Sequence, residues 1–136
     1  MGVPRLYQRI VENVQGRFNE ETGFKKWMID NGLDSKLDAL HENGAEFTNF
    51  FYDKLVFSKV RESFGGRIRL MFTGSAPLNI ETYYYMKAIM CCPLYEGYGL
   101  TENTTAAFTQ GTRDHEYGHL GAVTVIKSSN IDEPLI

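Results

Sequence analysis

The sequence predicts an α/β fold in which amphipathic helices precede a βαβ unit. Two observations lead to this class. Apolar residues recur every three or four positions through the first 66 residues, which is the helical period. After the glycine pair Gly65-Gly66, a short apolar run, a segment of helical length and a second short run follow within about 30 residues. We therefore expect residues 1–66 to be mainly helical and residues 67–136 to contain the βαβ unit.

The composition describes one globular unit with no strong electrostatic field. The 136 residues are 43% hydrophobic and 23% charged, and the formal net charge is -3. This charge disfavours nucleic acid and anionic membranes as partners. No apolar run approaches the ~20 residues that a membrane-spanning helix needs, so we expect a cytosolic or cytosol-facing protein.

Three amphipathic stripes predict the helices of the first half. Pro4 suits the first position of a helix, and Asn31-Gly32 is expected to interrupt the second stripe. The third stripe steps by fours and ends at Gly65-Gly66. The stripe residues are, in order, Leu6, Ile10, Val11, Val14 and Phe18; then Phe24, Trp27, Met28, Leu37 and Leu40; then Phe47, Phe51, Leu55, Val56, Val60 and Phe64.

The second half has the pattern of strand, helix and strand. Residues 67–73 are short, largely apolar and closed by Gly74, which predicts a strand. Asn79 is a good cap for a helix that reaches Met90, and Pro93 prevents its continuation into the run 94–96. The two strands of such a unit are expected to be parallel.

Ligands in open α/β sheets collect beyond the carboxyl ends of the strands, so the segments that follow the two strands are the candidate site. These segments are 74–78 and 97–102. Glycines let the backbone approach a ligand, and Tyr98 offers a flat face for a base. Thr101 offers a hydroxyl to a phosphate oxygen, and Glu102 offers a hard oxygen to Mg²⁺. The alternatives are a strand that ends in a glycine turn, and a Thr-Glu pair that starts a helix.

At these two segments the sequence resembles the AMP-forming adenylating enzymes. Residues 98–102 resemble the family's Y-G-x-T-E signature, and residues 74–78 are similar to its G-x-A-P-L loop. Within that superfamily the chain looks most like a long-chain fatty acyl-CoA synthetase of eukaryotic type, on residues 3–7, 54–57, 60–61 and 95–102. Residues 118–121 resemble the glycine pair that opens the family's next β subdomain.

The resemblance implies a fatty acid–CoA ligase that uses ATP, Mg²⁺ and coenzyme A. Residues 75–77 would line the adenine side, and residues 96–98 would form the wall on which the base packs. Thr101 would hold the α-phosphate, Glu102 would bind Mg²⁺, and both are the expected catalytic residues. The expected ATP- or AMP-binding set is Gly74, Ser75, Ala76, Pro77, Glu96, Gly97, Tyr98, Gly99, Leu100 and Thr101.

Several parts of such an enzyme have no counterpart in the sequence. We find in it no Ser/Thr/Gly-rich phosphate loop with its lysine, no later aspartate for the ribose hydroxyls, and no C-terminal domain that carries the catalytic lysine. We therefore expect one partial domain, part of the large N-terminal domain of the parent, that is inactive when isolated. The alternative is a non-catalytic nucleotide-binding or interaction module that retains a βαβ unit.

Overall fold

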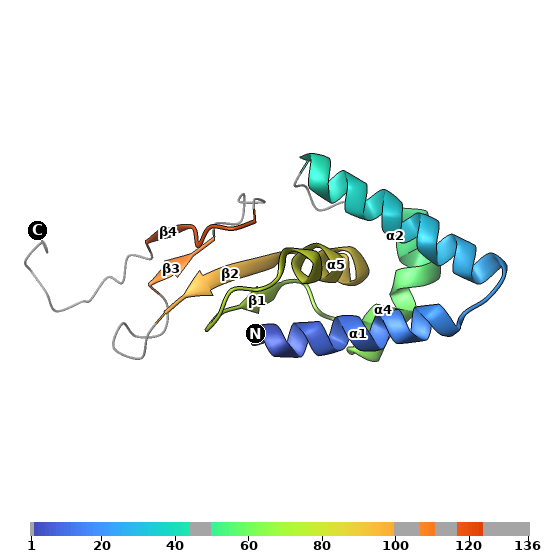
Figure 1. The fold of residues 1–136 in the computed structure, drawn as a ribbon, viewed down its shortest axis with the longest axis horizontal. Helices are drawn as coiled ribbons and strands as arrows, with labels where there is room; N and C mark the ends of the chain where they lie inside the picture. The colour runs from blue at the N-terminus through green and yellow to red at the C-terminus, as the bar shows by residue number, and fades with distance from the viewer. Residues whose placement is uncertain (1, 44–49, 100–106, 111–116, 124–136) are drawn as a thin grey trace, which may run out of the picture.

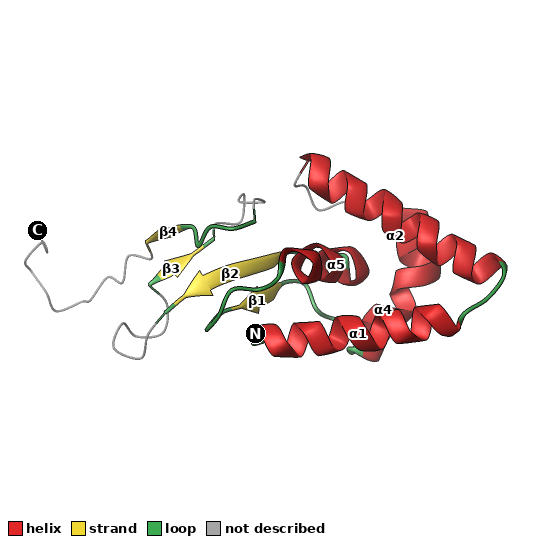
Figure 2. Cartoon of the chain, in the orientation of Figure 1, coloured by secondary structure: helices red, strands yellow, loops and turns green. Residues whose placement is uncertain are grey.

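The computed structural model describes residues 2–43, 50–99, 107–110 and 117–123. Helices gather at one end of the molecule and the strands at the other, with helix α5 (Ile80–Met90) between them (Figure 1). Figure 2 shows the same separation of helices from strands. This mixed architecture confirms the α/β prediction.

Within the described residues the sheet has four strands in the order β1-β2-β3-β4: Met71–Thr73, Leu94–Tyr98, Phe108–Thr109 and Ala122–Val123. β1 and β2 are parallel, with Met71 opposite Leu94 and Thr73 opposite Glu96, as predicted for a βαβ unit. β3 and β4 add to β2 in antiparallel pairs. The predicted first strand was too long, because residues 67–70 form no ladder and are mostly exposed.

Helix α1 (Pro4–Glu20) begins at Pro4, as predicted, and packs along the line Tyr7, Val11 and Val14. Leu6, which the stripe assigned to the core, is half exposed. The helix is rotated from the predicted face because Tyr7 reaches the sheet: its hydroxyl donates to the carbonyl of Phe72 over 2.9 Å. The Gly2 N–H donates to the same carbonyl over 2.9 Å, so the start of the chain lies on the outer edge of β1.

Helix α2 (Phe24–Asn43) is continuous, so the predicted interruption at Asn31-Gly32 is wrong. Gly32 is buried, and a Cβ atom there would lie 2.8 Å from the ring of Tyr52. The glycine is therefore a contact position rather than a helix end. Phe24 and Trp27 are 73% and 56% exposed and stack on each other instead of entering the core.

The third predicted helix is a helical run with a π segment inside it. α3 (Phe50–Tyr52) is followed by η1 (Asp53–Phe57) and α4 (Ser58–Ser63). The π segment turns the helix, so that the neighbours Val56 and Phe57 are both buried while Leu55 is exposed. Of the two lines of fours that the stripe predicts, Val56 and Val60 are buried, whereas Phe51 and Leu55 are exposed. Phe47 lies outside the described residues.

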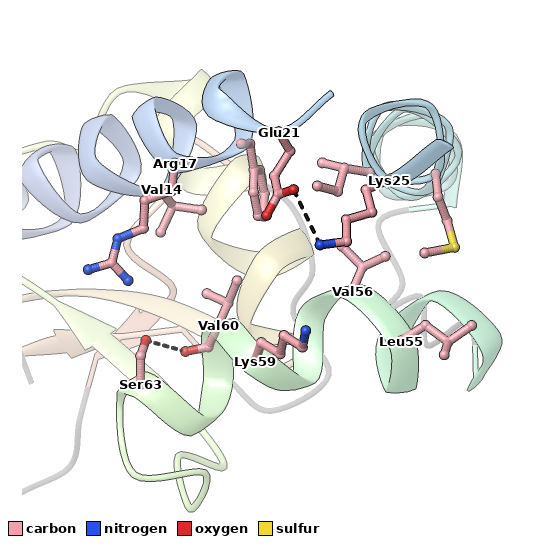
Figure 3. Close-up of a pocket in the computed structure, with 12 residues that line it drawn as sticks. Val14, Arg17, Glu21, Lys25, Leu55, Val56, Lys59, Val60 and Ser63 are labelled. Carbon is pink, nitrogen blue, oxygen red and sulfur yellow. Dashed lines mark hydrogen bonds and ion pairs between the residues drawn. The ribbon is translucent and has the colours of Figure 1, made fainter. Parts of the chain in front are cut away.

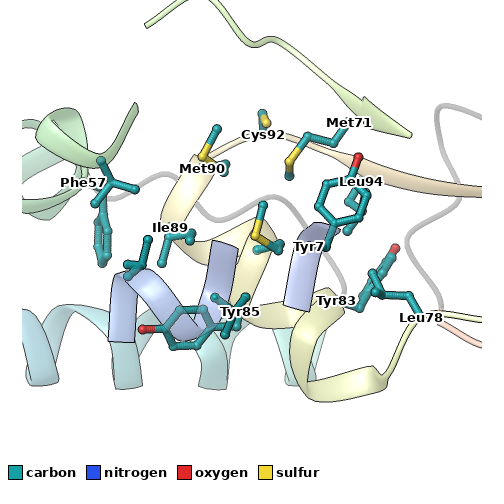
Figure 4. Packing of buried hydrophobic residues seen from close by; sticks show 14 of the residues in the cluster. Tyr7, Phe57, Met71, Leu78, Tyr83, Tyr85, Ile89, Met90, Cys92 and Leu94 are labelled. Carbon is teal, nitrogen blue, oxygen red and sulfur yellow. The ribbon is translucent and has the colours of Figure 1, made fainter. Parts of the chain in front are cut away.

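The core surrounds α5, which contacts α1, α2, α4 and β2. Asn79 caps α5 as predicted, because its side chain accepts a hydrogen bond from the Glu81 N–H over 2.8 Å. The helix is buried from Tyr85 to Met90, which is expected of a helix with structure on all sides. Figure 4 shows Ile89 and Met90 among core side chains from β1, β2, α1 and η1.

A buried cation joins the helices to one another. Lys36 on α2 is fully buried, and its ammonium group pairs with Asp53 on η1. It also donates to the Ala88 carbonyl over 2.9 Å and lies 2.9 Å from the Cys91 sulfur. The ammonium group is 4.4 Å from the centre of the Phe57 ring, a cation–π contact. One side chain therefore fixes α2, η1 and the end of α5 relative to one another.

We expect Lys36→Met to lower the free energy of unfolding by about 3 kcal/mol, because it leaves the Asp53 carboxylate without its buried partner. Urea unfolding followed by circular dichroism measures the change. The double variant Lys36→Met/Asp53→Leu removes both charges and is expected to recover at least half of the loss. A change below 0.5 kcal/mol in the single variant, on the order of a surface substitution, would contradict this role.

Candidate functional site

The two glycine-containing segments meet at the carboxyl end of the parallel pair, as predicted. A Cβ atom on Gly74 would lie 3.1 Å from the Gly97 carbonyl oxygen, so the backbones of the two segments are in contact. Gly97 itself has no room for a side chain, because a Cβ atom there would lie 2.3 Å from the Phe72 ring. Packing of the Phe72 ring against the backbone, not a turn, is the reason for glycine at Gly97.

The loop after β1 presents Ser75, Ala76 and Pro77 to solvent and buries Leu78 beneath them. Ser75 has φ 73°, the left-handed region that a side chain disfavours. Such strain persists where the surroundings hold the backbone in place, and it is concentrated at functional sites. The three predicted adenine-side residues are therefore exposed together on a constrained turn.

Glu96 is a buried carboxylate that braces this loop from below. Its side chain accepts a hydrogen bond from the Leu78 N–H over 3.2 Å. Burial raises the pKa of the Glu96 carboxyl, and this effect exceeds the opposing influence of the Leu78 hydrogen bond and of His119. The buried side chain of Glu96 thus holds the loop 74–78 in place by its hydrogen bond to Leu78. The next residues along β2 are less buried: Gly97 is half-buried and Tyr98 is exposed.

Gln110, Tyr117 and His119 also hold the loop after β1 and strand β2 in place, although sequence reasoning did not assign them to the site. The side-chain oxygen of Gln110 accepts from the Glu96 N–H over 2.8 Å, and its amide nitrogen donates to the His119 carbonyl over 3.0 Å. Tyr117 donates its hydroxyl to the Leu78 carbonyl. These contacts cross 14 and 39 residues of sequence. No local pattern signals partners at such separations.

Tyr98 lies at the end of β2 and is 43% exposed. Its ring centre is 6.3 Å from that of Phe108 on β3, tilted by 50°. One side of the phenol ring therefore has an aromatic neighbour while much of the residue remains open. This is the arrangement that a stacking platform for a base requires.

Thr73 is a buried hydroxyl at the carboxyl end of β1. Its residue is 1% exposed, and its oxygen has no hydrogen-bond partner among the described residues. It lies opposite Glu96 in the ladder, directly before Gly74. A buried hydroxyl without a partner is uncommon in folded proteins.

Two of the expected chemical groups, Thr101 and Glu102, lie outside the described residues, as does Leu100. Gly99 is described and half-buried at the end of β2. No cluster of three metal-ligating side chains occurs in the described ranges, and no described helix is long and apolar enough to cross a membrane. The phosphate and metal end of the site therefore remains a sequence-based prediction.

Comparison with known proteins gives one family. The family described as AMP-binding enzyme matches residues 1–130. Fatty acyl-CoA synthetase A of Dictyostelium discoideum is 38% identical over 120 residues, which is 88% of this chain and 18% of that protein. Long-chain-fatty-acid–CoA ligase 1 of Homo sapiens is 37% identical over 134 residues, 96% of this chain and 19% of the relative.

A further relative, long-chain-fatty-acid–CoA ligase 5 of Rattus norvegicus, is 38% identical over 119 residues, 88% of this chain and 17% of the relative. The chain therefore spans less than a fifth of the length of these curated relatives. No solved structure matches the chain.

The buried Glu96 carboxyl predicts a pH dependence of stability. A carboxyl whose pKa is raised in the folded state binds its proton more tightly there, so it contributes stability at low pH that is lost as the pH rises through the folded-state pKa. Glu96→Gln keeps an oxygen for the Leu78 N–H and removes this loss. We expect the variant to gain stability relative to the parent as the pH rises above the ordinary value of 4.5, and then to level off.

Urea unfolding at a series of pH values measures this difference. Glu96→Ala is the contrasting variant, because it leaves the Leu78 N–H without its acceptor and should cost about 1–3 kcal/mol. A pH profile for Glu96→Gln that runs parallel to that of the parent would show that Glu96 does not carry the effect.

Proposed function

The chain belongs to the AMP-binding enzyme family, and from this membership we propose that it is a segment of a long-chain fatty acid–CoA ligase. Of the relatives that match most of the chain, two are named long-chain-fatty-acid–CoA ligases and one is named a fatty acyl-CoA synthetase. The structural observation that carries the proposal is the contact between the two glycine segments at one sheet edge, where the Gly97 carbonyl would lie 3.1 Å from a Cβ atom on Gly74.

The proposed reaction has two steps. In the first, a carboxylate oxygen of the fatty acid attacks the α-phosphorus of ATP, and the bond to pyrophosphate breaks. In the second, the sulfur of coenzyme A attacks the acyl carbon, AMP departs with the bonding electron pair, and the thiol proton is released. Both steps develop charge on phosphate oxygens, so positioning and electrostatic stabilisation are the main tasks of the protein.

The described residues fit the nucleoside end of ATP. Ser75, Ala76 and Pro77 are exposed on a constrained turn, and the Tyr98 ring is open on the neighbouring strand. We assign the first three to the adenine side and Tyr98 to the packing face. Glu96 is assigned to the wall through its backbone and its support of Leu78, since its carboxylate is buried.

The phosphate end is assigned to residues 99–102, of which only Gly99 is described. Thr101 would donate its hydroxyl to an α-phosphate oxygen, and Glu102 would provide a carboxylate ligand for Mg²⁺. The metal ion neutralises charge on the polyphosphate when it is bound. The short distance along the chain from Tyr98 to Glu102 lets one segment contact both ends of the nucleotide.

The alternative is a nucleotide-binding or interaction module without chemistry. It would also retain the βαβ unit and the glycine segments. A test of synthesis by the full-length protein separates the two: incubation with a long-chain fatty acid, ATP, Mg²⁺ and coenzyme A should yield acyl-CoA, AMP and pyrophosphate in equal amounts. Binding of ATP without any of these products would favour the module.

We expect Tyr98→Ala in the full-length protein to weaken ATP binding by about 5- to 150-fold, because it removes a stacking face worth ~1–3 kcal/mol. The rate at saturating ATP should change less. Isothermal titration and initial rates at several ATP concentrations measure the two effects. Tyr98→Phe keeps the ring and is the matched control, and an equal loss in both variants would argue against stacking.

Substitutions of Thr101 and Glu102 should slow the reaction itself, whereas those of Tyr98 should mainly weaken ATP binding. Glu102→Gln keeps the shape but removes the charge that holds Mg²⁺, so turnover should fall and extra magnesium should restore part of it. Thr101→Val should slow the adenylation half-reaction and spare thioester formation from supplied acyl-adenylate. Both half-reactions are measured separately. Parental adenylation rates in both variants would remove this segment from the site.

A further inference from the structure

A cleft lies between the helices, away from the sheet edge. It has a volume of about 440 Å³, and its walls come from α1, the start of α2, and the η1–α4 segment (Figure 3). In Figure 1 these elements lie around the turn that joins α1 to α2, while β2 points its carboxyl end toward the opposite side of the molecule. None of the residues assigned above to the nucleotide site lines this cleft.

The interior of this helical cleft is apolar. The lining side chains that are fully or partly buried are hydrophobic and come from all three walls. They are Val14, Phe18, Met28, Ile29, Val56 and Val60. The volume lies in the range of small-molecule sites, and burial of a hydrocarbon against such a surface is favourable.

The rim of the cleft is cationic. Arg17, Lys25 and Lys59 line it together with a single carboxylate, Glu21, although the whole chain has a net charge of -3. Glu21 pairs with Lys25: the ammonium group of Lys25 lies 3.6 Å from a carboxylate oxygen of Glu21. Arg17 and Lys59 form no ion pair with any residue in the described ranges. Figure 3 shows Arg17 on the α1 wall and Lys59 on the opposite wall.

We propose that this helical cleft is a binding site for a single-chain long-chain carboxylate, whose tail lies on the apolar interior and whose head group meets Arg17 and Lys59. The charge complementarity selects an anion, and the apolar walls select a hydrocarbon. A helix of a partner is about 10–12 Å across and requires an open groove, whereas this cleft has walls from three helical segments. The proposal rests on the cleft alone and does not depend on the ligase reaction.

Photo-crosslinking of the full-length protein tests the proposal. The probe is palmitic acid with a diazirine on its tail, at a concentration below saturation, and labelled peptides are mapped by mass spectrometry. We expect saturable labelling within residues 14–29 and 55–63. Palmitate should compete, myristate should compete about 15-fold less well for want of two methylenes, and hexadecanol should compete poorly for want of the charge.

Charge reversal separates this site from non-specific binding. Arg17→Glu/Lys59→Glu should reduce labelling of the cleft peptides at least 10-fold. Arg5→Glu/Arg9→Glu is the matched control, because it makes the same charge change at exposed positions of α1 that do not line the cleft. Leu55→Trp, at a lining residue that is 47% exposed, should also block labelling without disturbing the core.

Three results would overturn the proposal. They are the absence of labelling in the cleft peptides, equal losses in the two charge-reversal variants, and equal competition by hexadecanol and palmitate. Acyl-CoA formation, measured in the same samples, keeps the outcomes separate. Cleft labelling without synthesis would support the cleft site and refute the proposed ligase function. Synthesis without cleft labelling would support the ligase function and refute the cleft site.

Discussion

The parallel pairing of β1 and β2 is the constraint on which the candidate site depends. Because the strands run in the same direction, the segments that follow them leave the sheet at the same edge, and Gly74 contacts Gly97 there. Parallel pairing requires a crossover, and α5 provides it as a helix buried on nearly every side. The site is therefore a product of the core: the hydrophobic packing of α5 fixes the strands, and the strands bring the two loops together.

Sequence periodicity predicted the elements that obey local rules. Pro4 begins α1, Asn79 caps α5, and the change of period after Gly66 marks the passage from helix to sheet. The predictions are wrong where the position of a residue is set by a contact with a residue far away in the sequence. Asn31-Gly32 predicts an interruption of the second stripe, but Gly32 is the place where Tyr52 packs. The π segment at 53–57 follows no spacing rule, because it brings both Val56 and Phe57 inward while Asp53 reaches Lys36.

In the candidate site, too, the features set by local sequence were predicted and those set by distant contacts were not. The exposed loop residues 75–77 and the open ring of Tyr98 were predictable, since short glycine-containing segments after strands have a recognisable pattern. The support beneath them was not, because Gln110 and Tyr117 act through hydrogen bonds to Glu96 and Leu78 that cross long stretches of chain. A carboxylate within a signature segment is also easily taken for a ligand-facing group, and only burial reveals that Glu96 has a supporting role.

The contact between the start of α1 and β1 has a consequence for the order of assembly during synthesis. Tyr7 and its hydrogen-bond acceptor Phe72 are 65 residues apart. At about 5–20 residues per second, the ribosome adds Tyr7 roughly 3–13 seconds before it adds Phe72. During that interval the apolar face of α1 has no sheet to cover it. A pause in translation just ahead of residue 71 would therefore lengthen the time for which this face of α1 is exposed.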